Sequence, residues 1–307
     1  MKVWLEPPAG LSRAMARVAA ALAAHLPPGA TVAASRDDAD LVLLHTIGFP
    51  DTAALANELL LRGQRYAIAQ YCLRSTQERS TLAWQSVWAA ADLVWSYYDL
   101  SAACAADGVE MDPRVNFYLS PLGLDRDFAQ CAVPPGAPRP IDVMTSGYVS
   151  TAQEAIWEFA LAAERLGRRV THVGPGTIQG MPRRPRGWSS VLGVTDYSLA
   201  GLYAQAKWVS GLRWCEGFEM PCIEGLACGA RPVVFDRPDM RQWYDGHAVF
   251  VPELPTAALV DALAAVLETQ PEPVGEAELQ AVRRRFAWAD VAAGFWQALA
   301  EKKEKVA

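Results

Sequence analysis

The chain has 307 residues, of which 51% are apolar, and it carries a formal net charge of −6. This length suits two domains of roughly 150 residues each, and the apolar content excludes a disordered chain. The acidic balance excludes a generally basic surface for nucleic acid, although it leaves a local one open.

The cysteines and the N-terminal residues indicate the cellular compartment of the protein. The six cysteines form no Cys-x-x-Cys pair and have no histidine at metal-ligand spacing, which favours a reduced protein with buried thiols. Pro7 and Pro8 interrupt the N-terminal segment, so no signal-peptide core is recognised, and no apolar run reaches the ~18–20 residues of a membrane helix. We therefore expect a cytoplasmic protein without integral membrane association.

Short apolar segments alternate with helical segments through the first half of the chain, which predicts a parallel α/β sheet. Strands are expected at about 2–6, 31–35, 40–44, 66–71, 92–97 and 116–120. Ligands bind at the carboxyl ends of such strands. Gly10, His45 and Arg74 follow the first, third and fourth predicted strands. His45 is a candidate catalytic residue, and Gly10 and Arg74 are candidates for the acceptor side or for phosphate. The alternatives are a histidine bonded to a loop carbonyl and a surface arginine.

A proline-rich stretch at 131–140 is the clearest change of composition in the chain. It reads as a linker between two domains. We therefore expect an N-terminal Rossmann-like domain at 1–135, a C-terminal Rossmann-like domain at 136–290, and a closing helix and tail at 291–307.

The second half repeats the strand and helix rhythm. Strands are expected at 141–145, 168–173 and 191–194, with helices at about 151–167, 198–206 and 257–268. A basic loop with an aromatic residue, Arg183, Arg184, Arg186 and Trp188, interrupts the pattern. Such a loop is a local anion site or a nucleic-acid contact. The alternative is a solvated surface loop.

The most informative stretch is a turn between a buried strand at 208–215 and a helix at about 222–228. Gly217 and Pro221 bracket the turn, and Gly229 is expected to end the helix. A strand end, a glycine turn and a helix N-terminus make an anion site, because free N–H groups and the positive end of the helix dipole meet there.

Two glutamates flank this turn, Glu216 before it and Glu224 within the helix. A ligand with a diphosphate between two hydroxylated rings would suit the arrangement, with phosphate at the N–H groups and one ring at each carboxylate. A nucleotide-sugar is such a molecule. The alternative is an ordinary strand, turn and helix whose glutamates face solvent.

The stretch from 216 to 234 resembles the donor-binding segment of the retaining glycosyltransferases with the two-domain GT-B fold, the large group 1 set. Their pattern is E-G-F-G-x-P-x-x-E-A-x-A-x-G-x-P-V-V. The matching residues are Glu216, Gly217, Phe218, Pro221, Glu224, Ala227, Gly229, Pro232, Val233 and Val234. Glu219 stands where glycine is usual, and Gly225 where alanine is usual. The resemblance is strongest over about 141–300.

The resemblance implies two Rossmann-like, doubly wound domains that face a cleft, the first on the acceptor side and the second binding the nucleotide-sugar, with a closing helix that crosses back. The implied reaction moves a sugar from a UDP- or GDP-sugar to an acceptor hydroxyl with retention. Glu224 would bind the ribose and Glu216 the transferred sugar. His45 would lie near that sugar, and Gly10 beside the donor diphosphate and the acceptor.

The backbone of the turn would contact the donor as well. The N–H groups of Phe218, Glu219 and Met220, next to Gly217, would face the diphosphate or the sugar. The Glu219 carboxylate would read a sugar hydroxyl or point to solvent.

One departure from the family concerns charge. The family usually places an arginine and a lysine after the glycine that corresponds to Gly147, but Tyr148 and the residues around 151–153 are not basic. A leaving diphosphate needs charge stabilisation in the transition state. It must come from the helix N-terminus at 218–222, from a first-domain arginine, or from Arg213, which we favour because it lies on the same strand end as Glu216.

We expect no metal and no bound cofactor. Asp38 and Asp40 imitate the D-x-D metal motif of the other major glycosyltransferase fold, but they precede their strand and read as a solvated turn. The sequence does not identify the acceptor, and the candidates are a glycan, a small molecule and a hydroxymethylated DNA base. The alternative functions are a module that binds a nucleotide-sugar or glycan without turnover, and an epimerase or phosphorylase on the same scaffold.

Overall fold

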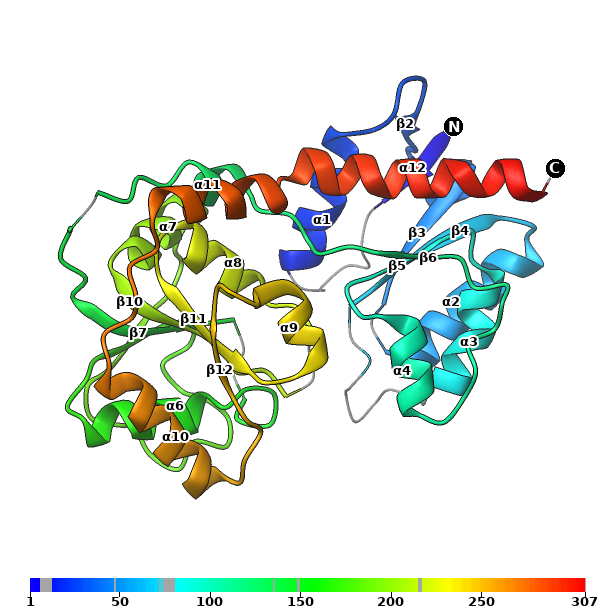
Figure 1. The fold of residues 1–307 in the computed structure, drawn as a ribbon. Coiled ribbons are helices and arrows are strands. Elements are labelled where there is room, and N and C mark those ends of the chain that lie inside the picture. Colours follow the sequence, from blue (N-terminus) through cyan, green and yellow to red (C-terminus); the bar gives the residue numbers. More distant parts are fainter. Residues whose placement is uncertain are drawn as a thin grey trace. The chain divides into compact units, whose positions relative to one another are not determined.

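The computed structural model describes residues 1–5, 13–46, 48–71, 73, 81–134, 136–147, 150–214 and 217–306. The chain forms two compact units, each of which is described by itself (Figure 1). The first unit contains Met1–Gly123 and Trp288–Ala307, and the second contains Leu124–Ala287.

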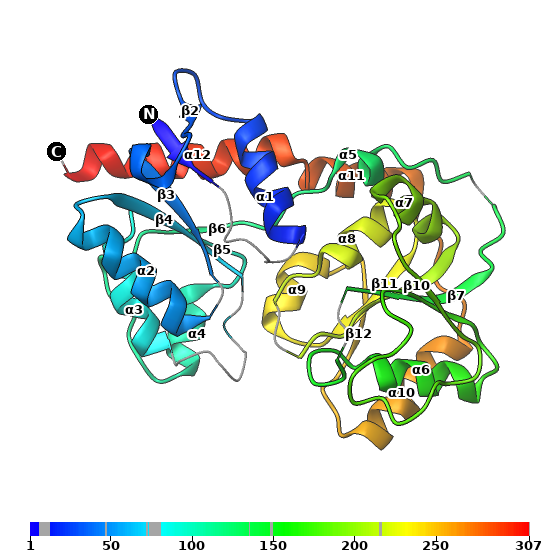
Figure 2. The same ribbon diagram turned by 180° about the vertical axis from the view of Figure 1, so that it is seen from behind.

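The first unit is a parallel sheet with the strand order β2-β1-β3-β4-β5-β6. Its strands are β1 (Lys2–Trp4), β2 (Thr31–Val32), β3 (Leu41–His45), β4 (Arg65–Gln70), β5 (Val94–Ser96) and β6 (Phe117–Leu119). Its helices are α1 (Arg13–Ala24), α2 (Phe49–Leu61), α3 (Thr81–Ala90), α4 (Leu100–Ala106) and α12 (Trp288–Val306), with a 3-10 turn at Arg36–Asp38. Helices α1 and α12 lie on one face of the sheet and α2, α3 and α4 on the other (Figures 1 and 2).

The second unit is also a parallel sheet, with the order β12-β11-β10-β7-β8-β9. Its strands are β7 (Ile141–Ser146), β8 (Val170–Val173), β9 (Trp188–Val191), β10 (Ala206–Gly211), β11 (Arg231–Phe235) and β12 (Val249–Val251). Its helices are α5 (Arg126–Ala129), α6 (Ile156–Arg165), α7 (Asp196–Ala204), α8 (Met220–Ala227), α9 (Pro238–Tyr244), α10 (Thr256–Glu268) and α11 (Glu276–Arg285). Helices α6 and α10 pack together on one face, whereas α5, α7, α8 and α11 gather on the other (Figure 2).

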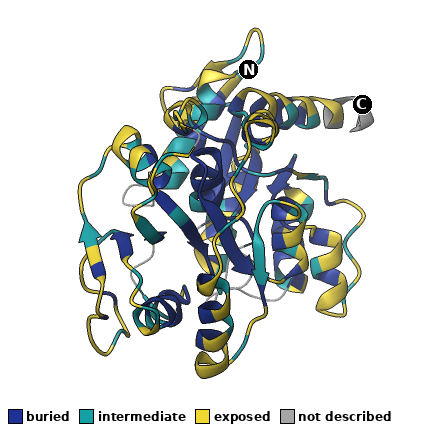
Figure 3. Ribbon diagram, turned by 60° about the vertical axis from the view of Figure 1, so that its left-hand side comes forward, coloured by how far each residue is buried: buried dark blue, intermediate teal, exposed yellow. Residues whose placement is uncertain are grey.

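The core of each unit is the sheet with the apolar faces of its helices, as the dark blue strands in Figure 3 show. All five residues of β3 and all five of β11 are buried, as expected for parallel strands covered on both faces. The predicted fold class, two doubly wound α/β domains, is therefore confirmed. Among the residues that the structure describes, no helix is long and apolar enough to cross a membrane.

The division between the units differs from the predicted boundary at 135. Residues from Leu124 onward pack with the second unit, because α5 rests on α7 and α8, and Phe128 is buried against Tyr203. At the other end, α12 joins the first unit, where Trp288 makes an edge contact with Trp95. The proline-rich stretch at 131–140 thus lies within the second unit.

Two predicted elements of the second unit are shifted. The strand expected at 191–194 lies at Trp188–Val191, where it pairs with β8 along its whole length. The helix expected from about 151 begins only at Ile156. The residues before it pair with another segment instead, since the Ala155 N–H donates to the Leu212 carbonyl and the Trp214 N–H donates to the Gln153 carbonyl.

Candidate functional site

The predicted strand, turn and helix is present in the second unit. Strand β10 ends at Gly211, helix α8 begins at Met220 with Pro221 in its first turn, and β11 follows in parallel. Gly229 has φ +83°, the left-handed conformation that ends a helix. The positive end of the α8 dipole therefore points toward the carboxyl edge of the sheet, where ligands bind in open α/β folds.

Two glycines let α8 lie directly on β10. A Cβ atom at Gly225 would stand 2.7 Å from the Val209 Cγ1 atom, and one at Gly211 would meet the Cys222 sulfur. The methyl group of an alanine at 225 would therefore clash. This close packing explains why Gly225 replaces the alanine of the glycosyltransferase pattern.

Glu224 lies inside α8 and is 2% exposed. Its Oε2 atom accepts a hydrogen bond from the Tyr203 hydroxyl at 3.5 Å, and this hydroxyl is 3.0 Å from the Ser146 Oγ atom. Burial, reinforced by the charge of Glu224, raises the pKa of Tyr203 well above its ordinary value, so Tyr203 stays protonated and can donate. The chain of contacts links α8, α7 and the carboxyl end of β7.

Arg213 is the centre of a buried ionic network. Its guanidinium is 1% exposed, donates to Glu219 Oε2 at 2.8 Å and pairs with Glu154 as well. It also donates to the Ser146 carbonyl at 2.5 Å, and the Ser210 hydroxyl donates to Glu154 at 2.9 Å. The network joins the end of β7, the segment before α6 and the residue before α8.

The pKa values in this network follow from burial and from the opposite charges. Burial raises the pKa of the Glu154 carboxyl, although Arg213 opposes this effect. Burial alone would lower the pKa of Arg213, but Glu154 and Glu219 hold it above its ordinary value. Arg213 is therefore a permanent cation whose charge is balanced within the fold.

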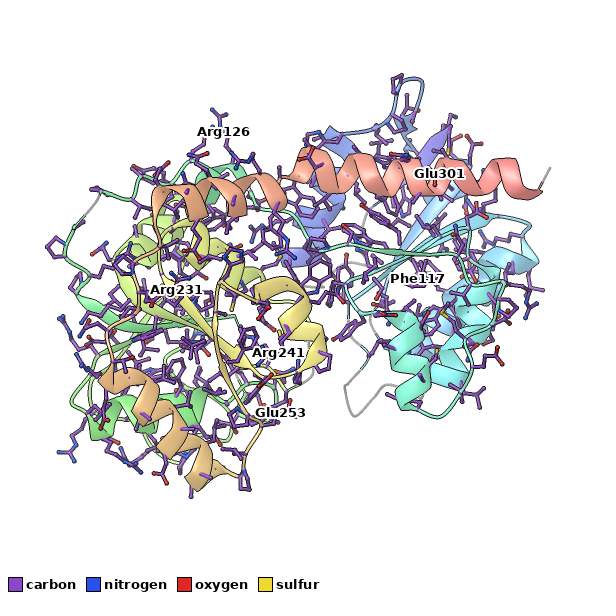
Figure 4. The ribbon with its side chains drawn as sticks, viewed as in Figure 1. Phe117, Arg126, Arg231, Arg241, Glu253 and Glu301 are labelled. Carbon is purple, nitrogen blue, oxygen red and sulfur yellow. The ribbon has the colours of Figure 1, made fainter. Side chains whose placement is uncertain are left out.

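Arg237, which follows β11, also supports the segment that leads to α8. Its guanidinium is 5% exposed, donates to the Arg213 carbonyl at 2.9 Å and pairs with Glu253 at 2.8 Å. Figure 4 labels Glu253, which follows β12, and Arg241, which lies in α9 after β11. Both therefore follow the carboxyl ends of strands, whereas Arg231, also labelled, is the first residue of β11. Arg237 thus fixes the backbone around the predicted phosphate-binding turn.

Several solved structures are similar to this chain in fold. Sucrose-phosphate synthase from Thermosynechococcus elongatus superposes with a TM-score of 0.66 at 15% identity, over 88% of this chain and 75% of that one. HepE from Anabaena in complex with UDP-glucose gives a TM-score of 0.61 at 12% identity, over 87% and 79%. The pneumococcal O-GlcNAc transferase GtfA in complex with UDP and GlcNAc gives 0.63 at 13%, over 85% and 56%.

The chain has the GT-B fold. The predicted resemblance to GT-B glycosyltransferases is therefore confirmed at the level of structure. The sequence matches no protein-family model and no curated protein. At identities of 8 to 15%, the solved structures establish the fold alone.

Several predicted donor-site residues of this GT-B chain are buried around the turn. Phe218 is 2% exposed and stacks on Tyr244, and Gly217 and Met220 are buried as well. The Glu219 N–H was expected to face the ligand, but it donates to the Tyr244 hydroxyl at 2.8 Å, which donates back to the Glu219 carbonyl. The Glu219 carboxylate neither points to solvent nor stands open to a sugar, because it is 2% exposed and holds Arg213.

Gly147 and His45 also have defined surroundings. Gly147 adopts φ +98° at the end of β7, and a Cβ atom there would lie 3.4 Å from the Arg213 Nη2 atom. In the first unit, His45 closes β3 and is 4% exposed. Its Nδ1 atom is 2.7 Å from the Tyr71 hydroxyl and its Nε2 atom is 2.8 Å from the Leu5 carbonyl. Burial lowers the pKa of His45, so its ring is a neutral, fully hydrogen-bonded group.

The arginines of the basic loop contact their own unit. Arg183 and Arg186 share the carboxylate of Glu164, and Arg184 donates to the Trp188 carbonyl at 2.9 Å. Because two of the three cations face one carboxylate, the loop carries less net positive charge than its sequence suggests.

Four predicted site residues lie outside the described residues, namely Gly10, Arg74, Tyr148 and Glu216. The structure adds Glu154, Tyr203, Ser146 and Arg237, which the sequence did not single out. Tyr203 stands in the helix expected at 198–206, within the stretch where the resemblance to the family is strongest, so a signal existed for it. Glu154 gave none, because its partner Arg213 is 59 positions away.

Proposed function

We propose that this chain is a glycosyltransferase that moves a sugar from a nucleoside diphosphate sugar to an acceptor hydroxyl with retention of configuration. The observation that carries the proposal is the placement of Glu224 on α8, behind a glycine turn at the carboxyl edge of a parallel sheet. Solved structures of the same fold include complexes with UDP and UDP-glucose, which favours UDP as the nucleotide.

In this proposal Glu224 binds the ribose, because a buried carboxylate gains most from hydroxyl donors that replace water. Glu216 holds the transferred sugar at reacting distance. The α8 N-terminus receives the diphosphate, and the leaving phosphate stabilises the positive charge that develops on the sugar. Positioning and electrostatics supply most of the rate enhancement.

Arg213 has an indirect role in this proposal. Its guanidinium already donates to two carboxylates and one carbonyl, so its charge is paired within the protein. We therefore do not assign it the neutralisation of the diphosphate. Instead it ties the end of β7 to the residue before α8, and these two segments flank the proposed phosphate position. A positioning role agrees with its burial.

The two glutamates are expected to differ in kinetics. Glu224→Ala should weaken donor binding, whereas Glu216→Ala should mainly lower turnover, because one contacts the nucleotide and the other the reacting sugar. Release of UDP from UDP-sugars measures turnover, NMR of the product gives the anomeric configuration, and calorimetry gives donor affinity. Equal losses of turnover in both variants, with donor affinity unchanged, would contradict the division of roles.

The reaction is proposed to need no metal ion. Both aspartates of the D-x-D-like sequence are engaged in the first unit, where Asp38 pairs with the Lys2 side chain at 2.7 Å and Asp40 accepts from the Lys2 N–H at 2.7 Å. Among the described residues, no group of three metal-ligating side chains occurs. Turnover should persist in excess chelator. A loss that Mg²⁺ or Mn²⁺ restores would contradict this part of the proposal.

A second candidate function is a module that binds a nucleotide-sugar without turnover. It is favoured by the neutralised state of Arg213, because the family's basic pair after Gly147 has no replacement at that guanidinium. The discriminating measurement follows donor consumption over many hours with and without glycan acceptors. Tight donor binding without transfer or hydrolysis would favour the module over the enzyme.

A hydroxymethylated DNA base is a further acceptor candidate, and the basic loop is the feature that motivates it. Replacement of Arg183, Arg184 and Arg186 by glutamine should abolish duplex DNA binding if the acceptor is DNA, and binding to the unchanged protein should weaken steeply with salt. The absence of any salt-sensitive DNA binding would leave a glycan or a small molecule as the acceptor.

A further inference from the structure

A buried chain of hydrogen bonds connects three elements of the second unit. The Tyr203 hydroxyl on α7 donates to the Glu224 Oε2 atom on α8 at 3.5 Å, and it lies 3.0 Å from the Ser146 Oγ atom at the end of β7. All three residues are buried. An ionised carboxylate only accepts hydrogen bonds. The hydrogen of Tyr203 therefore points to Glu224, and Ser146 donates its own hydrogen to the Tyr203 oxygen.

The hydroxyl of Tyr203 is not needed to fill space. The ring makes an edge contact with Phe128 of α5 at 6.1 Å between centroids, and a phenylalanine ring would fill the same contact. A buried hydroxyl costs free energy unless it is hydrogen-bonded. Burial raises the pKa of Tyr203 well above its ordinary value, so the hydroxyl keeps its hydrogen and can donate. What the hydroxyl adds to the ring is therefore a contact with the Glu224 carboxylate.

That contact restricts the carboxylate of Glu224. The last torsion of a glutamate side chain has a broad range of angles unless a donor holds one of the oxygens. The bond at Oε2 fixes the plane of the carboxylate, and with it the direction of Oε1. A group that is already held in its bound orientation loses less conformational entropy when a ligand binds to it.

Ser146 connects this chain to the phosphate end of the candidate site. Its backbone carbonyl accepts a hydrogen bond from Arg213 at 2.5 Å, and the next residue, Gly147, adopts φ +98°. The side chain of Ser146 thus supports Tyr203 and Glu224, while its backbone belongs to the turn after β7. The two ends of the proposed donor site are held by one residue.

We propose that Tyr203 is the positioning residue of the ribose site, and that with Ser146 it makes the site select ribonucleoside over deoxyribonucleoside diphosphates. The role of Tyr203 rests on the proposed function, in which Glu224 binds the ribose of the donor. A carboxylate held in one orientation gains a full hydrogen bond from a ribose hydroxyl. A deoxy analogue leaves the same buried carboxylate without that partner, and it is therefore the poorer ligand.

Calorimetric titration of the full chain with UDP, 2′-deoxy-UDP and 3′-deoxy-UDP tests this role. In the unchanged protein, loss of the hydroxyl that meets Glu224 should weaken binding about tenfold to a hundredfold, as for a hydrogen bond to a charged group. Tyr203→Phe should reduce this ratio of dissociation constants by about threefold or more, because the carboxylate must then be immobilised on binding. A merely structural role would weaken all three nucleotides by the same factor and leave the ratio unchanged.

Tyr66→Phe is the matched control. Tyr66 is buried in the first unit, where its hydroxyl donates to the Val87 carbonyl at 2.8 Å, so this variant also loses a buried hydroxyl but should keep the ratio. Ser146→Ala should reduce the ratio by less than Tyr203→Phe does. It should reduce the ratio no further when added to Tyr203→Phe, because Ser146 acts through the Tyr203 hydroxyl.

The outcomes separate this role from the proposed function. If the unchanged protein prefers UDP to a deoxy analogue but neither Tyr203→Phe nor Ser146→Ala alters the ratio, the positioning role is overturned and the ribose site stands. If the unchanged protein binds none of the three nucleotides, or binds all of them equally, the ribose site on Glu224 falls together with the role of Tyr203. This second result needs no variant to fold.

Discussion

At the scale of single residues, the departures of this chain from the glycosyltransferase pattern have physical causes. Gly225 replaces alanine because α8 lies against Val209, and Glu219 replaces glycine because its carboxylate holds Arg213. Neither cause was visible in the sequence, because both depend on neighbours that the fold supplies. Both residues therefore support the local structure of the candidate site.

The first residue-scale prediction concerns Gly225. A methyl group there would lie 2.7 Å from Val209, so Gly225→Ala should destabilise the protein by about 1–3 kcal/mol through overpacking. Gly201→Ala is the matched control, because Gly201 lies in α7 with nothing within 4 Å of its added Cβ. That change should stabilise by about 0.5–1 kcal/mol, since alanine is the better helix former. Chemical denaturation measures the free energy of unfolding of both variants. A change of the same sign in the two variants would contradict the packing argument.

The second residue-scale prediction concerns His172, which is fully buried at the end of β8 and hydrogen-bonded to Thr145. Burial, helped by the charge of Arg213, lowers its pKa from 6.5 to about 4. The folded state therefore excludes the proton. Stability is complete above about pH 6.5 and falls toward about pH 4, with a slope that approaches 1.4 kcal/mol per pH unit.

The measurement for His172 is the free energy of unfolding at several pH values between 4 and 7. His172→Phe keeps a ring next to Trp188 and should flatten the slope. His25→Gln changes an exposed histidine and should not. His45, whose pKa burial also lowers, contributes with the same sign in both variants and cancels in the comparison. An unchanged slope in His172→Phe would contradict the assignment.

At the scale of elements, the sequence predicts best where special residues set the boundaries. Helix α8 was expected at 222–228 and lies at Met220–Ala227, because Pro221 opens it and Gly229 ends it. The start of α6 was predicted too early, because residues 153–155 pair with 212–214 across a long sequence separation. Such pairing leaves no periodic signal in either segment.

The ionic network that joins these segments gives an element-scale prediction. Arg213→Met would leave the Glu154 and Glu219 carboxylates buried without their cation, and it should cost about 3–5 kcal/mol. Arg165→Met removes an exposed pair with Asp261 and should cost less than about 1 kcal/mol. Denaturant unfolding compares them. Similar losses in the two variants would show that the network does not hold the turn before α8.

At the scale of the whole molecule, the alternation of strands and helices predicted the fold class, and most of the resemblance to the glycosyltransferase family lies in the second unit. The boundary between the two units could not be predicted from the same pattern. A proline-rich stretch looked like a linker, but α5 buries Phe128 against α7 before that stretch begins. A proline-rich composition indicates an irregular segment, but the packing of the side chains around it decides to which unit the segment belongs.

The central claim is that the second unit holds a nucleoside diphosphate at α8 with its ribose on Glu224. Thermal unfolding of the full chain with a panel of nucleoside diphosphates and their sugars tests it most directly, with Glu224→Gln as the variant and the exposed Glu268→Gln as its control. A ligand at about 100 times its dissociation constant adds roughly 2.7 kcal/mol, which corresponds to several degrees. The account predicts a shift with UDP or UDP-sugars that Glu268→Gln keeps and Glu224→Gln loses. No shift with any nucleotide, or an equal shift in both variants, would contradict it.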